Sequence, residues 1–215
     1  MDLITNVKVS AINSLTDARF FSGAGVKYLG FCFDKNSERY IESEKVFQIK
    51  DWVSGPSIVG EFSTNSNPDE INLISQKTGL DYVQMTDAFP LGLNSEIEKP
   101  IFQEIVIEEL SDLYNLQAKM EERSENVYAY VLNFLVHSYP WDVIELDPSN
   151  IDIIWKATAE HKVIIDTRIN KENVLNILQR TKAYGINIPA GNEISTGLQS
   201  FEDVADLLEV LESGV

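Results

Sequence analysis

The sequence has a single cysteine, Cys32, and few basic residues. It contains 17 Lys and Arg residues and 34 Asp and Glu residues, which gives a formal net charge of −17. One cysteine excludes a framework of disulfide bonds. The shortage of positive charge argues against DNA or RNA as a partner, because nucleic-acid phosphates require a basic surface. It argues equally against binding to an anionic membrane surface.

Long apolar runs are also missing. No stretch approaches the length of a membrane-spanning helix, and the start, Met1-Asp-Leu-Ile4, lacks the basic and apolar segments of a signal peptide. These absences predict a cytoplasmic protein without membrane partners. A chain of 215 residues can bury a sizeable core, and residues 1–215 are expected to form one domain.

What the chain does have is a regular alternation of short apolar segments with amphipathic ones. The expected strands are residues 7–12, 28–33, 57–63, 81–86, 101–107, 127–134, 162–166 and 185–188. The expected helices are residues 18–24, 43–53, 68–78, 108–122, 148–160, 170–181 and a last helix that follows a capping box at Ser200–Asp203. Two further helix starts are marked by a capping box at Ser14–Asp17 and by Asn67-Pro-Asp-Glu70.

Strands that alternate with helices predict a parallel sheet with right-handed crossovers, and eight such units close into a (β/α)₈ TIM barrel. The alternative is an open, doubly wound sheet. That fold normally carries a glycine-rich phosphate loop after its first strand, and Ala11-Ile-Asn-Ser14 is not such a loop. The predicted fold is therefore a single-domain α/β barrel.

One arginine stands out by its position after a buried strand. Leu29-Gly-Phe-Cys-Phe33 is apolar on both faces, and Arg39 follows it after the polar turn Asp34-Lys-Asn-Ser-Glu38. In α/β folds, ligands bind at the C-terminal ends of the strands, and a guanidinium can donate two parallel hydrogen bonds to a carboxylate or phosphate. The other interpretation is that Arg39 pairs with a neighbouring acidic side chain.

Four segments of the first part of the chain are Lys8-Val-Ser-Ala-Ile-Asn13, Gly25-Val-Lys27, Leu29-Gly-Phe-Cys-Phe33 and Ser37-Glu-Arg-Tyr-Ile41. In order and spacing they resemble the phosphoribosylanthranilate isomerase family of tryptophan biosynthesis. The resemblance implies a TIM barrel that carries out an Amadori rearrangement of N-(5′-phosphoribosyl)anthranilate without a cofactor. Such a reaction requires a general acid, a general base, a phosphate site and a cation for the anthranilate carboxylate.

The two proton-transfer positions that the resemblance implies are both substituted. The family's basic cysteine corresponds to Ser10, and its acidic aspartate corresponds to Asn133. A serine hydroxyl lacks an accessible anionic form near neutral pH, and an asparagine amide cannot deliver a proton. Ser10 is therefore expected to be a small packing residue at the end of its strand.

The implied ligand-binding positions are only partly retained. Arg39 would bind the carboxylate, and Gln84 and Gly191 match the family pattern. Asp166 and Thr167 replace two glycines of the phosphate site, and Pro189 and Ala190 replace two serines. Asp166 would repel a phosphate unless it pairs with Arg168.

Other groups could have taken over the chemistry. His137 follows the sixth expected strand and is a candidate acid–base group, the alternative being a solvated loop histidine. Asp34, Glu61, Asp87 and Asp166 could gather at the barrel mouth, although their spacing is not that of metal ligands. His161 precedes a strand and is expected to be structural.

Two functions remain open on the sequence alone. The chain is either a phosphoribosylanthranilate isomerase-like enzyme with weak or lost activity, or a non-catalytic paralogue, a pseudoenzyme, that binds a small acidic metabolite or a protein. In either case the expected ligand is a small phosphorylated or carboxylate metabolite. A new enzyme chemistry based on His137 and carboxylates is a third hypothesis, and the barrel is expected to be a monomer or a homodimer.

Overall fold

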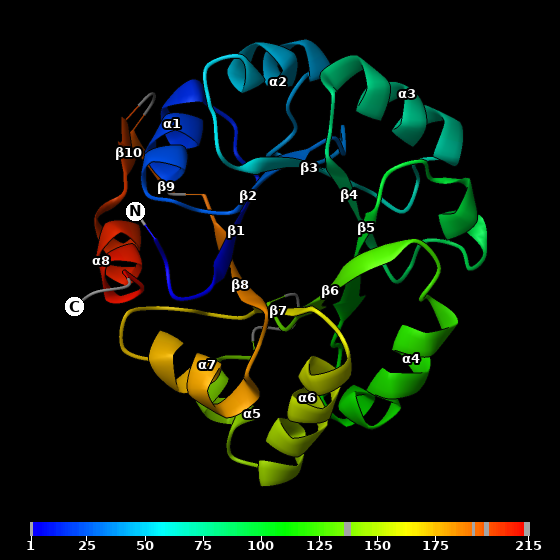
Figure 1. Cartoon of the computed structure of the whole chain (residues 1–215), viewed down its shortest axis with the longest axis vertical. Coiled ribbons are helices and arrows are strands. Elements are labelled where there is room, and N and C mark those ends of the chain that lie inside the picture. The colour runs from blue at the N-terminus through cyan, green and yellow to red at the C-terminus, as the bar shows by residue number, and fades with distance from the viewer. Residues whose placement is uncertain (1, 136–138, 191, 196–197, 213–215) are drawn as a thin grey trace.

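The protein is a closed parallel barrel surrounded by helices, as shown by a computed structural model that describes residues 2–135, 139–190, 192–195 and 198–212 (Figure 1). Within these residues, each strand from β1 to β7 pairs in parallel with the next, and β8 closes the ring by pairing with β1. The barrel strands are β1 (Asn6–Ser10), β2 (Tyr28–Cys32), β3 (Ser57–Phe62), β4 (Tyr82–Thr86), β5 (Ile101–Val106), β6 (Val127–Asn133), β7 (Val163–Asp166) and β8 (Gly185–Pro189). The predicted TIM barrel is confirmed, and the open sheet is excluded.

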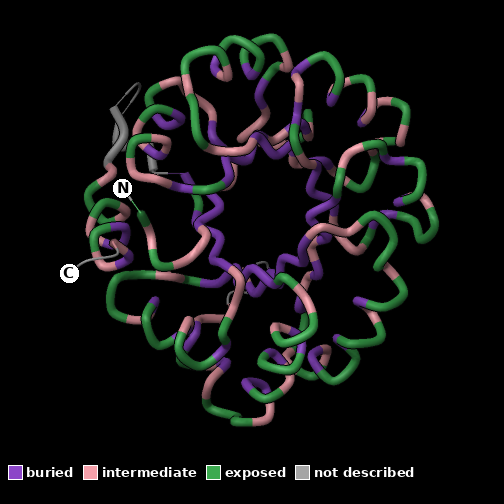
Figure 2. The backbone as a smooth tube through the Cα atoms, viewed as in Figure 1, coloured by how far each residue is buried: buried purple, intermediate pink, exposed green. Residues whose placement is uncertain are grey.

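The helices form an outer layer whose buried side faces the strands (Figure 2). They are α1 (Leu15–Gly23), α2 (Ser43–Lys50), α3 (Pro68–Thr78), η1 (Leu93–Glu96), η2 (Leu110–Asn115), α4 (Leu116–Glu122), α5 (Trp141–Ile144), α6 (Pro148–Glu160), α7 (Val174–Thr181) and α8 (Glu202–Val210). No helix in the described part of the chain is long and apolar enough to cross a bilayer.

Two of the predicted helix starts are confirmed by their hydrogen bonds. The Ser14 side chain accepts a hydrogen bond from the Asp17 backbone N–H, and Asn67 does the same for Glu70. Each bond satisfies a backbone donor that the first helical turn leaves without a partner. Gly79 ends α3 in the left-handed region, with φ of 66°.

The prediction for the last helix was wrong at its start. Ser200 lies in β10 (Leu198–Ser200), which pairs antiparallel with β9 (Asn192–Ser195) as a small hairpin outside the barrel. Helix α8 begins at Glu202 after Phe201, which makes no capping hydrogen bond through its side chain. Phe201 instead stacks on Phe20 of α1 with ring centroids 4.2 Å apart, so aromatic packing anchors this helix.

Three further predictions needed correction. The expected helix over residues 108–122 begins as the 3₁₀ helix η2, where Glu109 and Asp112 form a capping box, and becomes α-helical at Leu116. The expected helix over residues 170–181 begins only at Val174, because the Asn170 side chain accepts hydrogen bonds from two following backbone N–H groups. The expected helix over residues 43–53 ends at Lys50, and Trp52, which lies beyond it, is 68% exposed.

The barrel interior has two different halves. Its lower half, toward the strand N-termini, contains a core cluster of Tyr28, Val59, Phe102, Ala129, Val131 and Ile164. Its upper half, toward the strand C-termini, contains buried polar side chains such as Lys8, Gln84 and Asn187. Since TIM barrels bind their ligands at the C-terminal ends of the strands, the upper half is the candidate site.

Candidate active site

Strand periodicity explains which side chains enter the upper half of the barrel. Successive strand residues point to opposite faces, so Lys8 and Ser10 share one face of β1. The register pairs Lys8 with Asn187 and Ser10 with Pro189 across β1 and β8. Polar residues at these positions therefore meet inside the barrel.

Lys8 is the central cation of this interior. Its side chain is fully buried, and its Nζ donates to Glu61 Oε1 at 2.5 Å, to Ser10 Oγ at 2.8 Å and to Asn187 Oδ1 at 3.3 Å. A buried ammonium group is tolerated only when it is paired and hydrogen-bonded in this way. The Lys8–Glu61 ion pair thus links β1 to β3 through the barrel interior.

The Lys8–Glu61 ion pair depends on a glycine and supports a strained residue. A Cβ atom added to Gly30, on the strand between the two, would lie 2.1 Å from Glu61 Oε1 and 3.1 Å from Lys8 Nζ. The second carboxylate oxygen of Glu61 accepts the Ala11 backbone N–H at 3.1 Å. Ala11 has φ of 58°, in the left-handed region that glycine adopts more readily.

Ser10 is held firmly by its neighbours. Its hydroxyl accepts a hydrogen bond from Lys8 and donates one to Asn187 Oδ1 at 2.8 Å. The Lys8 ammonium beside it is ion-paired with Glu61, so it is not a base that could activate the hydroxyl. Ser10 therefore has the geometry of a structural hydrogen-bonding residue rather than that of a general base.

Asn133 and Gln84 both attach to Glu104 of β5. Glu104 accepts hydrogen bonds from Asn133 Nδ2 and, at 3.0 Å, from Gln84 Nε2. Asn133 Oδ1 also accepts the Leu135 backbone N–H at 2.8 Å, which orients the amide. The Gln84 Oε1 atom is buried without a hydrogen-bond partner in the described residues. The position where the resemblance implies a general acid thus carries an amide that is held by hydrogen bonds to Glu104 and to the Leu135 backbone.

Asp166 ends β7 beside Asn133, with which it pairs in the strand register. It is 5% exposed, and its Oδ1 atom has no hydrogen-bond partner among the described residues. Burial raises the pKa of Asp166 to about 7, with the negative charges of Glu104 and Glu61 acting in the same direction and the Asn187 side chain and Lys8 opposing them. A carboxyl group with such a pKa is partly protonated near neutral pH.

The groups expected to bind phosphate offer few donors. The Thr167 hydroxyl donates to the Tyr139 carbonyl at 2.7 Å, and the Ala190 backbone N–H donates to the Ser10 carbonyl at 2.9 Å. Pro189 has no N–H to give. Gly191 and His137 lie outside the described residues.

Arg39 lies in the loop between β2 and α2, and its backbone N–H donates to Ser37 Oγ at 3.1 Å. The neighbouring Tyr40 forms a parallel bridge with Cys32, which ties this loop to the end of β2. Arg39 is half-buried, and none of the ion pairs between described residues engages its guanidinium. The expected alternative, a structural ion pair of Arg39 with a neighbouring acid, is not observed there.

The other acidic residues expected at the mouth do not join one cluster. Asp34 accepts the Asn36 backbone N–H, and Asp87 accepts the Val106 backbone N–H and lies 3.6 Å from Lys119. Arg168 does not ion-pair with Asp166 within the described chain and instead lines an outer groove of about 430 Å³ beside Trp141. The residues that the structure describes contain no group of three or more His, Cys, Asp or Glu side chains placed to hold a metal ion.

Sequence reasoning missed three members of the site: Lys8, Glu104 and Asn187. Each is a polar residue within a predicted strand and has at least one apolar neighbour in it, and that pattern was available as a signal. Lys8 is also two residues before Ser10 and hence on the same strand face. His161, which is expected to be structural, packs its ring edge-to-face against Tyr130 with ring centroids 5.3 Å apart.

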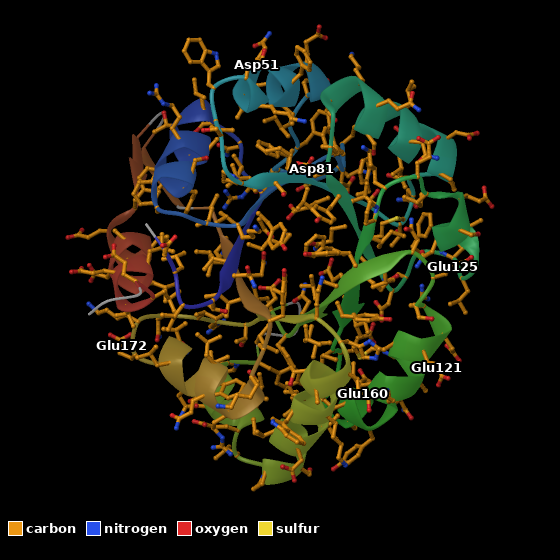
Figure 3. All side chains as sticks on the ribbon, in the orientation of Figure 1. Asp51, Asp81, Glu121, Glu125, Glu160 and Glu172 are labelled. Atoms are coloured by element: carbon orange, nitrogen blue, oxygen red, sulfur yellow. The ribbon has the colours of Figure 1, made fainter. Side chains whose placement is uncertain are left out.

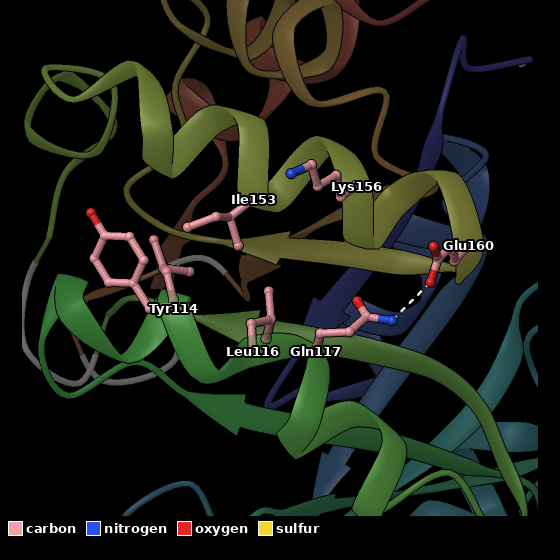
Figure 4. A pocket seen from close by; sticks show the side chains of 7 residues that line it. Tyr114, Leu116, Gln117, Ile153, Lys156 and Glu160 are labelled. Atoms are coloured by element: carbon pink, nitrogen blue, oxygen red, sulfur yellow. Dashed lines mark hydrogen bonds between the residues drawn. The ribbon is translucent and has the colours of Figure 1, made fainter.

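Two features outside the barrel are separate from this site. A groove of about 330 Å³ between η2, α4 and α6 is lined by helix residues, with Gln117 donating to Glu160 across it at 2.7 Å (Figure 4). Much of the negative charge lies on the outer layer, where Asp51, Glu121 and Glu172 are exposed (Figure 3). Neither feature contains a residue predicted to act in the site.

The sequence of this chain is similar to those of known proteins. Residues 7–210 match a family profile described as N-(5′-phosphoribosyl)anthranilate (PRA) isomerase. A relative named N-(5′-phosphoribosyl)anthranilate isomerase, from Nitrosomonas eutropha, is 26% identical over 216 residues, covering 97% of this chain and 95% of the relative.

Solved structures agree with that match at the level of the fold. Phosphoribosyl anthranilate isomerase from Thermotoga maritima superposes with a TM-score of 0.79 at 18% identity, covering 97% of this chain and 98% of the other. A complex of the isomerase with reduced 1-(o-carboxyphenylamino)-1-deoxyribulose 5-phosphate gives a TM-score of 0.76 at 20% identity, with 97% and 98% coverage.

Proposed function

The chain belongs to the N-(5′-phosphoribosyl)anthranilate isomerase family, and we propose that it acts on N-(5′-phosphoribosyl)anthranilate in tryptophan biosynthesis, with a much reduced rate of isomerisation. The substrate is the one named for its relatives. The reaction is the Amadori rearrangement, in which the ribose ring opens and a proton moves along the sugar. A biosynthetic role of this kind implies a cytoplasmic protein, as a monomer or a homodimer, with a small phosphorylated metabolite as its partner.

The reduced rate is inferred from the side chains at the two proton-transfer positions, Ser10 and Asn133. Ser10 is hydrogen-bonded to Lys8 and Asn187, and Asn133 is hydrogen-bonded to Glu104 and the Leu135 backbone. Neither side chain can carry the proton that the family reaction moves at its position. Loss of one general acid or base typically lowers a rate by about 10²–10⁴-fold, and here both positions are substituted.

Substrate recognition is proposed to rest on Arg39. Arg39 is half-buried, the neighbouring Cys32–Tyr40 bridge ties its loop to the end of β2, and its guanidinium makes no ion pair with the described residues. A planar guanidinium in this state is suited to bind the anthranilate carboxylate with two parallel hydrogen bonds.

A fluorescence assay of phosphoribosylanthranilate consumption by the pure protein tests this function. We expect slow turnover that falls at least about tenfold in Arg39→Ala, because one bidentate charge-assisted contact would be lost. Lys35→Ala is the matched control, since Lys35 is a 71% exposed cation in the same loop, and it is expected to retain wild-type turnover. Absence of turnover in the folded wild-type chain would refute the isomerase function.

A second function, a non-catalytic barrel that binds a metabolite or a protein, is favoured by one observation. Glu61 and Glu104 place carboxylates in the upper barrel interior, while Thr167 and Ala190 use their donors within the protein. Carboxylates would oppose the binding of a phosphorylated substrate. Calorimetric titration with the reduced substrate analogue distinguishes the two: the isomerase function requires this phosphorylated analogue to bind, whereas a folded chain that neither binds it nor turns over the substrate supports the non-catalytic function.

A further inference from the structure

Strand β7, which lies next to β6, carries an acidic residue at the position paired with Asn133. Asp166 pairs with Asn133 in the register of β6 and β7. It lies two residues after Ile164, which belongs to the core cluster inside the barrel, so the Asp166 side chain shares that inward face. A carboxyl group is thus present one strand away from the position where the family places its aspartate.

The surroundings of Asp166 leave one carboxyl oxygen available. The residue is 5% exposed, and Oδ1 has no hydrogen-bond partner in the described chain. Buried polar atoms in native proteins almost always have partners, so an open acceptor at the C-terminal end of barrel strands indicates a place for a ligand. The unpartnered Oδ1 atom is independent of the strand register, and it too indicates a ligand site at the C-terminal end of the barrel strands.

Charged and polar groups face Asp166 from four other strands. Glu104 on β5 and Glu61 on β3 disfavour its ionised form, whereas Lys8 on β1 and the Asn187 side chain on β8 favour it. Burial is the largest influence, and the pKa of about 7 leaves a substantial protonated fraction at neutral pH. In that form Asp166 does not repel a phosphate by charge, contrary to the expectation from the sequence.

We propose that Asp166 is the general acid of this barrel and replaces the aspartate that the family carries at the position of Asn133. The inference rests on the isomerase function proposed above. It explains how a chain with an amide at the usual acid position could still open the ribose ring, and it assigns a role to the unsatisfied Asp166 Oδ1 atom.

The step moves one proton and two electron pairs. The Asp166 carboxyl donates its proton to the ribose ring oxygen while the bond between that oxygen and C1′ breaks. The electron pair of this bond goes to the ring oxygen, which becomes a hydroxyl. The lone pair of the anthranilate nitrogen forms the C1′=N bond, which leaves a cationic imine and an Asp166 carboxylate.

The test measures kcat, KM and their pH dependence in the wild type and in Asp166→Asn. The amide has nearly the same shape but no proton to transfer, so we expect kcat to fall about 10²–10⁴-fold with little change in KM. Because the protonated form is active, wild-type kcat should decline as pH rises through about 7, whereas the residual rate of Asp166→Asn should not follow that decline.

Two variants complete the design. Asn133→Asp in the Asp166→Asn background returns a carboxyl to the family's position. Its kcat should be at least about tenfold higher than that of Asp166→Asn alone. Asp87→Asn is the charge-matched control, because Asp87 is a carboxylate at a strand end that contacts the Val106 backbone and Lys119 and is expected to retain wild-type kinetics.

The outcomes separate this inference from the proposed function. No turnover by the folded wild-type chain refutes the isomerase function and the role of Asp166 with it. Wild-type turnover together with unchanged kcat and an unchanged pH profile in Asp166→Asn refutes only the role of Asp166. If Asp166→Asn fails to fold, a wild-type kcat that is constant between about pH 6 and 8 refutes the assignment.

Discussion

The two ends of the barrel interior satisfy their polar groups in different ways. At the lower end, the hydroxyls of Tyr28, Tyr128 and Tyr184 form a closed triangle with separations of 2.9 to 3.1 Å. Lys162 covers the Tyr128 ring, with its Nζ 3.9 Å from the ring centroid. Each hydroxyl can donate to the next around this ring, so the lower end requires no outside partner.

The upper end is built around charge and remains incomplete. Lys8 is surrounded by Glu61, Ser10 and Asn187, yet Gln84 Oε1 and Asp166 Oδ1 are buried without partners in the described chain. An unsatisfied buried acceptor costs about 1–3 kcal/mol, which a closed network avoids. The comparison indicates that the lower end satisfies its hydroxyls within the protein, whereas the upper end leaves two buried acceptors unsatisfied among the described residues at a cost in stability.

The largest effect is expected at the upper end, from Lys8→Met. Removing Lys8 leaves the Glu61 carboxylate without its partner, and breaking a buried ion pair typically costs about 3–5 kcal/mol. Urea denaturation followed by circular dichroism measures the loss. The matched control is Lys8→Met combined with Glu61→Val, which removes both charges and should recover most of the stability. A Lys8→Met variant that is as stable as the wild type would contradict the central role of this ion pair.

A smaller effect is expected from Gly30→Ala. The new methyl group would lie 2.1 Å from Glu61 Oε1, so the ion pair or the strand must shift. We expect a loss of about 1–3 kcal/mol in the free energy of unfolding, as for other overpacked sites. Gly23→Ala is the control, since a Cβ there meets nothing within 4 Å. Equal stability of the two variants would show that the upper interior is more loosely packed than the contacts indicate.

The smallest effect is expected at the lower end, from Tyr128→Phe. Deleting one hydroxyl opens the triangle and should cost about 1 kcal/mol. The control is Tyr114→Phe, which alters a tyrosine that is 65% exposed on the outer layer and should change stability little. A cost as large as that of Lys8→Met would remove the contrast between the two ends.

The same variant has a spectroscopic signature. Burial acts to raise the pKa of Tyr128, but hydrogen bonds from Tyr184, Tyr28 and Tyr82 and the Lys162 charge lower it to about 8. Titration of tyrosinate absorbance should show a phase near pH 8 that is lost in Tyr128→Phe and kept in Tyr114→Phe. Because Tyr128 then releases its proton at a lower pH in the folded protein than in the unfolded chain, this tyrosine should add stability as pH rises from about 8 towards 10.

Much of the fold could be predicted, because it depends on local patterns. Alternating strand and helix segments predicted the barrel, and the caps at Ser14 and Asn67 are confirmed by their hydrogen bonds. The start of α8 could not be predicted, because it depends on a stack of Phe201 with Phe20, about 180 residues earlier in the chain. The hairpin of β9 and β10 likewise places Ser200 in a strand rather than at a helix cap.

The candidate site likewise has some properties that the residue types determine and others that depend on the tertiary structure. Residue types alone determined that Ser10 and Asn133 lack the proton-transfer chemistry of a cysteine and an aspartate, because a hydroxyl and an amide keep that limitation in any fold. Only the tertiary structure determined the pKa of Asp166. From the sequence alone, this residue was expected to be an ionised carboxylate that repels a phosphate. Its altered pKa arises from burial and from charges on other strands, and closure of the barrel brings those strands together.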